Sequence, residues 1–217
     1  MTTDTSPTGR AATPMPGQTR GDPRRFNVKS WLWWTVAFVS FPIAGIAAQA
    51  AVGRVNDAVA ALAGGLIAGA VIGTGQWLAA RRLLGDPLAW IAATAAAMGV
   101  GLLAGAWVVG YGTSIGELAL MGAITGLPVG AAQAFLLRGR VAYPWVWAAA
   151  MPPLWALGWT VTAAAGVGVD RQYAVFGAFG AITFMALSGI VLDRLRAAAT
   201  PAAPSPPHRP PTATAQP

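Results

Sequence analysis

The stretch GLIAGAVIGTGQWLAARR, residues 65–82, decides the fold, because its pattern returns 57 residues later as GAITGLPVGAAQAFLLRG, residues 122–139. Each copy carries a glycine at every fourth position, a glutamine three residues after the third glycine, and an arginine five residues after the glutamine. Such repetition indicates one building block used more than once. The shared positions are Gly65, Gly69, Gly73 and Gln76, then Gly122, Gly126, Gly130 and Gln133.

A third, eroded copy lies near the end of the chain. Gly180, Ile182 and Arg196 keep the register with one inserted residue. Ser188 and Val191 stand there in place of the last glycine and the glutamine. The repeat extends to the preceding segments, in which a tryptophan precedes a glycine by eleven residues. These pairs are Trp34 and Gly45, Trp90 and Gly101, and Trp147 and Gly158.

The composition indicates a membrane protein. Hydrophobic residues make up 55% of the 217 residues and charged residues only 10%, against roughly one quarter charged in soluble domains. Six apolar runs of roughly twenty residues could each cross about 30 Å of hydrocarbon as a helix, and a run such as 88–110 lacks the polar face that a soluble bundle needs. We predict an all-α, six-span helical membrane bundle, with spans at 31–51, 57–80, 88–110, 116–137, 143–166 and 174–194.

Basic residues predict the orientation of the bundle. Of the 14 lysines and arginines, five lie in the N-terminal tail, two near 81–82, two at 138–140 and three from 194 onward. Only Arg54 and Arg171 lie on the other side. Because cytoplasmic loops carry an excess of basic residues, both termini are expected to be cytoplasmic. These arginines at span ends also account for the net charge of +7 without nucleic-acid binding.

Two tails flank the predicted transmembrane domain, residues 30–196. Residues 1–29 and 197–217 contain too few large apolar side chains to offset the entropy of ordering, so disordered cytoplasmic tails are expected. Trp31, Trp33 and Trp34 follow the first tail, at the expected depth of the headgroups. The domain itself is predicted to hold three two-helix units that point the same way, as parallel repeats do. Their limits are about 31–80, 88–137 and 145–195.

The glycine stripes and the glutamines have structural and functional interpretations. Glycines at every fourth position line one face of a helix, so a neighbouring backbone can approach, and alanine should be milder there than leucine. An amide that faced lipid would leave its polar atoms unpaired, so Gln76 and Gln133 should point inward or reach the headgroups. Two roles remain open for them, an interhelical hydrogen bond or the lining of a polar pocket.

Three prolines distinguish the later spans from the first copy. Pro128 lies within span 116–137, and Pro152 and Pro153 lie in the middle of span 143–166. Because proline frees a carbonyl one turn earlier and bends the helix, kinks are expected at these positions. Broken helices at mid-membrane build solute sites in transporters, which favours a transport function.

The spans lack the side chains that catalysis needs. The chain has no cysteine, and its one histidine, His208, lies in the proline-rich tail. Asp86 before Pro87 fits an N-cap, and Glu117 fits the first turn of span 116–137, where the helix dipole favours it. We therefore expect no enzymatic activity, metal or cofactor. The acidic residues at predicted span ends are Asp57, Asp86, Glu117, Asp170 and Asp193.

The repeated pattern resembles that of a family of bacterial multi-span membrane proteins of uncharacterised activity. The pattern is the glycine stripe followed by Gln76-Trp77, the pair Arg81-Arg82 and a tryptophan-rich span. The resemblance covers about residues 57–165, although the second copy has Gln133-Ala134 where the first has Gln-Trp. It implies this repeated architecture and supplies no site residue.

Two function classes fit these observations. The first is a structural or interaction component of the bacterial membrane, in contact with lipid and with a membrane-protein partner or a second copy. The glycine stripes, the lack of catalytic side chains in the spans and the expected disordered tails favour this first class. The second is a small transporter or pore for a neutral or apolar solute, which the threefold repeat, inward amides and kinked spans favour. A polar central cavity that reaches Gln76 and Gln133 would favour the second.

Overall fold

The computed structural model describes residues 26–168 and 173–199, and every regular element in these ranges is helical. Both predicted tails lie almost wholly outside the described residues. Five segments are long and apolar enough to cross a membrane, namely Val28–Val52, Ala58–Leu84, Pro87–Val108, Ile115–Leu136 and Ala178–Ala199. The elements are α1 (Val28–Val36), η1 (Ala37–Val39), α2 (Ser40–Val52), α3 (Ala58–Leu84), α4 (Pro87–Val108), α5 (Ile115–Leu136), α6 (Pro144–Ala164) and α7 (Ala178–Ala199).

Helix α6 corresponds to the fifth predicted span, 143–166, but falls outside this apolar set. It is 21 residues long, and its sequence holds four tryptophans and three prolines. These residues are less apolar than the leucine, isoleucine and valine of a typical span, so they lower the mean hydropathy of the segment. Length and mean hydropathy therefore support five of the six predicted spans.

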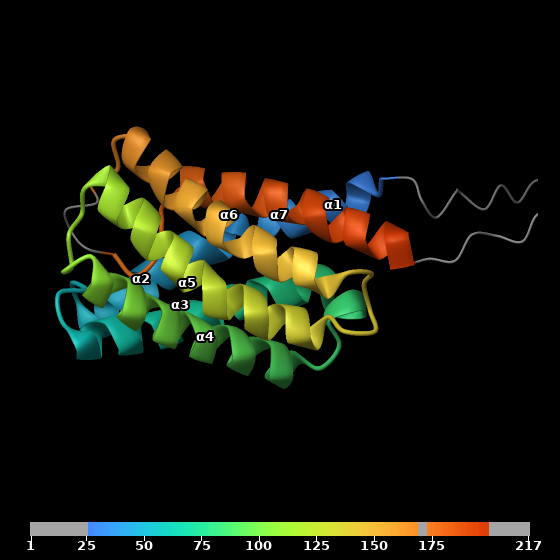
Figure 1. Cartoon of the computed structure of the whole chain (residues 1–217), viewed down its shortest axis with the longest axis horizontal. Coiled ribbons are helices and arrows are strands. Elements are labelled where there is room, and N and C mark those ends of the chain that lie inside the picture. Colours follow the sequence, from blue (N-terminus) through green and yellow to red (C-terminus); the bar gives the residue numbers. More distant parts are fainter. Residues whose placement is uncertain (1–25, 169–172, 200–217) are drawn as a thin grey trace, which may run out of the picture.

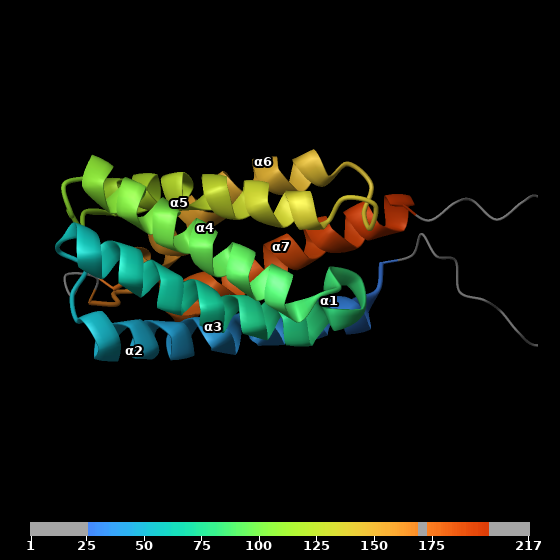
Figure 2. The same ribbon diagram turned by 90° about the horizontal axis from the view of Figure 1, so that it is seen from below.

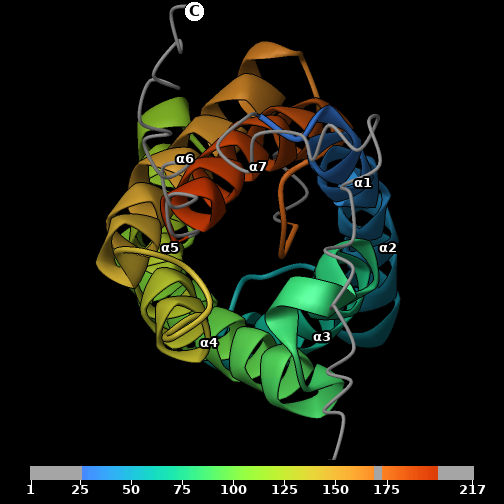
Figure 3. The same ribbon diagram turned by 90° about the vertical axis from the view of Figure 1, so that its right-hand side faces the viewer.

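The helices form a ring. Each helix packs on the next along the chain from α2 to α7, and α7 packs back on α1. Figure 3 looks along the helices and shows this ring, whereas Figures 1 and 2 show it from two sides. The described chain begins and ends at the same end of the ring, which we call the tail end (Figure 1). The opposite end is called the far end.

Polar side chains cap the starts of four helices, and at α1 the Asn27 Oδ1 atom accepts a hydrogen bond from the N–H of Ser30 at 3.0 Å. Asp86 accepts hydrogen bonds from the backbone N–H groups of Leu88 and Ala89 at 2.7 and 3.3 Å, with Pro87 in the first turn, which confirms the predicted N-cap. Ser114 and Glu117 form a capping box at the start of α5. Asp57 caps α3 through the N–H of Ala60 at 2.8 Å. Each cap satisfies backbone donors that a helix start leaves unpaired.

Two helix irregularities lie away from the predicted kinks. Pro128, Pro152 and Pro153 stand within helices that continue through them. Instead, the 3-10 turn η1 interrupts the first span just before Pro42, whose ring would clash with the carbonyl of Phe38 in a regular α-helix. The second irregularity is Ala80 in α3, with φ −129° and ψ 27°.

The last predicted span begins later and ends later than expected. The span was placed at 174–194, but α7 runs from Ala178 to Ala199. Residues 174–176 are buried without being helical, and the segment before α7 projects into the middle of the ring in Figure 3. A hydrogen bond of 3.1 Å from the backbone N–H of Gly177 to the Thr162 hydroxyl holds this segment on α6.

Aromatic side chains fill the ring around this inserted segment. The Phe176 ring stacks on Phe41 at a centroid distance of 5.0 Å and meets Trp155 at 5.1 Å. Phe184 of α7 lies 5.5 Å from Trp155. All four side chains are at most 1% exposed. Tilted and edge-to-face pairs of this kind pack favourably, so this part of the ring is a solid core.

The glycine stripes bring helix backbones together. A Cβ atom added at Gly65 would lie 2.7 Å from the Met98 carbonyl oxygen, and one added at Gly69 would lie 2.7 Å from the Cα of Ala95. A Cβ atom at Gly126 would lie 2.7 Å from the Met151 carbonyl oxygen. Real Cβ atoms essentially never come within 3.0 Å of such atoms. Helices α3 and α4, and likewise α5 and α6, therefore touch so closely that even the Cβ atom of an alanine would force the backbones to shift.

Candidate functional site

The two glutamines of the repeat meet inside the ring. Gln76 of α3 is 2% exposed and Gln133 of α5 is fully buried. The Gln133 Nε2 group donates to the Gln76 Oε1 atom at 3.0 Å and to the Thr94 hydroxyl of α4 at 3.1 Å. One amide therefore ties three helices together, and both of its N–H groups have acceptors.

Tryptophans complete this network from the two following helices. The Trp90 indole of α4 donates to Gln76 Oε1 at 3.3 Å, and the Trp147 indole of α6 donates to Gln133 Oε1 at 3.1 Å. Each tryptophan follows its glutamine by 14 residues. The glutamine of each copy thus accepts the indole N–H of the next helix. We call these five residues the amide network: Gln76, Trp90, Thr94, Gln133 and Trp147.

A serine takes the corresponding role where the third copy lacks its glutamine. The Trp34 indole of α1 donates to the Ser188 hydroxyl of α7 at 3.0 Å, and both residues are buried. This bond joins the first and last helices. The sequence marked Ser188 only as a lost glycine. The signal that could have identified it is the tryptophan shared by all three copies, whose buried N–H needs an acceptor.

The amide network is suited to holding helices rather than to chemistry. A side-chain amide stays neutral near pH 7, neither protonated nor deprotonated, so it does not serve as a general acid or base. All five side chains of the network are buried. A hydrogen bond in this low-dielectric setting joins its helices and avoids the cost of an unpaired polar group. Of the two roles left open by the sequence, this geometry favours the interhelical hydrogen bond.

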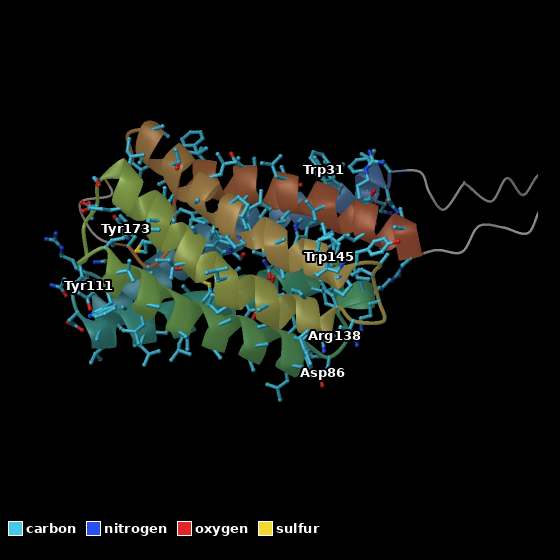
Figure 4. The ribbon with its side chains drawn as sticks, viewed as in Figure 1. Trp31, Asp86, Tyr111, Arg138, Trp145 and Tyr173 are labelled. Atoms are coloured by element: carbon cyan, nitrogen blue, oxygen red, sulfur yellow. The ribbon has the colours of Figure 1, made fainter. Side chains whose placement is uncertain are left out.

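A pocket of about 780 Å³ lies elsewhere, at the tail end between α1, α3 and α7. Neither Gln76 nor Gln133 lines it. Trp31, Trp34 and the α3 residues 78–83 form much of its wall. In Figure 4, Trp31, Trp145 and Arg138 lie toward the tail end, whereas Tyr111 and Tyr173 lie toward the far end.

The acidic residues have structural partners wherever the structure describes them. Asp57, Asp86 and Glu117 take part in helix caps. The Asp193 carboxylate accepts from the backbone N–H of Asn27 at 3.3 and 3.4 Å. Within the described ranges there is no group of three or more His, Cys, Asp or Glu residues that could hold a metal ion. Asp170 and His208 lie outside these ranges.

Comparisons with protein-family models, with curated proteins and with solved structures found no match. The two features of the structure that bear on function are the buried amide network and the basic residues of the tail end.

Proposed function

We propose that the protein is a non-enzymatic, multi-pass component of the bacterial cytoplasmic membrane with a structural or interaction role. Five apolar helices are compatible with an integral membrane protein. The observation that carries the proposal is the amide network, in which both Gln133 N–H groups and the carbonyl oxygens of both glutamines bond to other helices. The aromatic core around Phe176 also favours a packed interior over a solute path.

The same proposal assigns six membrane spans in three parallel units, as the sequence repeat implies. Helix α6 completes the set because it lies between α5 and α7 in the ring. The identical spacing of the Trp90–Gln76 and Trp147–Gln133 bonds supports the equivalence of the first two units. The resemblance to the bacterial multi-span family is part of this proposal. Contacts with lipid, and with a membrane-protein partner or a second copy, complete it.

A flux measurement separates this proposal from a transporter or pore. We expect liposomes that contain the purified protein to release glycerol and urea no faster than protein-free liposomes, because both Gln133 N–H groups and the carbonyl oxygens of both glutamines are already bonded within the protein and do not replace water around a solute. The matched variant is Gln76→Leu with Gln133→Leu. Protein-dependent flux in the wild type that this double variant abolishes would contradict the proposal and favour the transporter.

The orientation is tested with single cysteines, which suit a chain that has none. Asn56→Cys at the far end and Ala198→Cys near the end of α7 both replace exposed residues. Because most basic residues lie at the tail end, we expect a membrane-impermeant thiol reagent to label intact cells at position 56 only. Position 198 should react after permeabilisation. The reverse pattern would show that the tail end faces outward.

A further inference from the structure

The pocket at the tail end carries a net positive charge from three different helices. Its lining includes Lys29 of α1, Arg81 and Arg82 of α3 and Arg196 of α7, with Asp193 as the one carboxylate among the lining residues. We propose that this pocket binds a phosphate group, supplied by the headgroup of an anionic phospholipid. The inference goes beyond the proposed function and rests on its membrane placement.

The single carboxylate of the pocket is already engaged by the protein. Asp193 is 8% exposed, and its carboxylate accepts the backbone N–H of Asn27, just before α1. Arg196 donates to the Ser30 hydroxyl at 3.4 Å. Both bonds hold α1 against α7 and thereby set the width of the pocket. With four cations against one hydrogen-bonded carboxylate, the pocket favours an anion.

The depth of the pocket indicates a lipid headgroup. Trp31 and Trp33 line it, and tryptophans gather at the level of the headgroups in membrane proteins. The Trp31 indole donates to the Ala186 carbonyl of α7 at 2.9 Å, which holds its ring in the wall. Leu78 and Leu192 add apolar surface beside the cations. A ligand with a phosphate and an apolar portion matches this combination.

The shape of α3 also contributes to the site. The departure from helical geometry at Ala80 falls within the pocket wall, directly before the two arginines. Guanidinium groups form paired hydrogen bonds with phosphate oxygens, and basic pockets between transmembrane helices on the cytoplasmic side bind such headgroups. Residues of three helices line the pocket, and its volume of about 780 Å³ suits one headgroup rather than an extended polyanion.

The test uses the full chain in a neutral detergent. Phosphatidylglycerol and phosphatidylcholine of the same chain length are added in equal amounts, and bound lipid is counted by native mass spectrometry. The pocket variant is Arg81→Gln with Arg82→Gln. The control is Arg138→Gln with Arg194→Gln, which removes the same charge from the tail end at residues outside the pocket lining. Lys29→Gln serves as a second pocket variant if the first does not fold.

We expect the wild type and the control to prefer phosphatidylglycerol, and the pocket variant to lose about 10- to 30-fold in affinity for it. Inorganic phosphate at millimolar concentration should not displace the lipid. Equal losses in the pocket and control variants would overturn the proposal, because only surface charge would then matter. Displacement by inorganic phosphate would also overturn the lipid source and assign the pocket to a soluble phosphate compound. Neither result affects the flux and labelling tests of the proposed function.

Discussion

Replacement of Gln133 by leucine is expected to lower the free energy of unfolding by about 2 to 4 kcal/mol. The substitution removes three hydrogen bonds, to Gln76, to Thr94 and from Trp147. It also leaves the Trp147 N–H unpaired at a residue with 0% exposure. Unfolding in mixed micelles, titrated with a denaturing detergent, measures the difference.

Gln49→Leu is the matched control for this prediction, since it makes the same change in α2. The Gln49 Oε1 atom is buried and has no hydrogen-bond partner. Leucine there removes an unsatisfied acceptor, so stability should stay within about 0.5 kcal/mol or rise. Equal effects of the two substitutions would show that the amide network does not stabilise the ring.

Alanine at Gly69 or Gly126 is expected to lower the free energy of unfolding by about 1 to 3 kcal/mol, and leucine by more. In each case the added Cβ atom would meet backbone atoms of the facing helix at 2.7 Å. A backbone cannot rotate away as a flexible side chain can, so the helices must separate and lose contact along the stripe. The midpoint of thermal aggregation in detergent gives an independent measurement.

Gly45→Ala is the control for the glycine prediction, because it is also a glycine within a helix. A Cβ atom there would lie 3.5 Å from the Val175 side chain, an ordinary contact. Alanine favours helix over glycine by up to about 1 kcal/mol, so stability should be unchanged or slightly higher. A loss as large as that at Gly69 would mean that glycine flexibility, rather than close packing, matters at these positions.

Much of the architecture could be predicted from local sequence. Long apolar runs predict helices, because a helix pairs its backbone N–H and C=O groups within the segment. The all-α class and most helix limits therefore follow from the positions of these runs. The repeat also shows that Gln76 and Gln133 are equivalent, and their polarity requires that they face other helices or the headgroups. The N-cap at Asp86 follows from three residues of local sequence.

The local sequence could not predict those features that depend on the distance between helices. The glycine spacing predicts a close approach of helices, but only the structure shows that even a Cβ atom at Gly69 would meet the α4 backbone, because that distance depends on how two helices pack. Residues 174–177 were read as helix because they are mostly apolar, but Phe176 finds its aromatic partners inside the ring instead.

The sequence by itself determined the helical class, the repeat and the presence of inward amides, because these depend on residue type and spacing along one chain. Only the tertiary structure decided which groups are bonded. Trp34 meets Ser188 across 154 residues, and Lys29 joins Arg81 and Arg196 in one pocket. A hydrogen bond or a charged pocket requires atoms within a few ångströms, and that proximity arises only when the first and last helices pack together and close the ring.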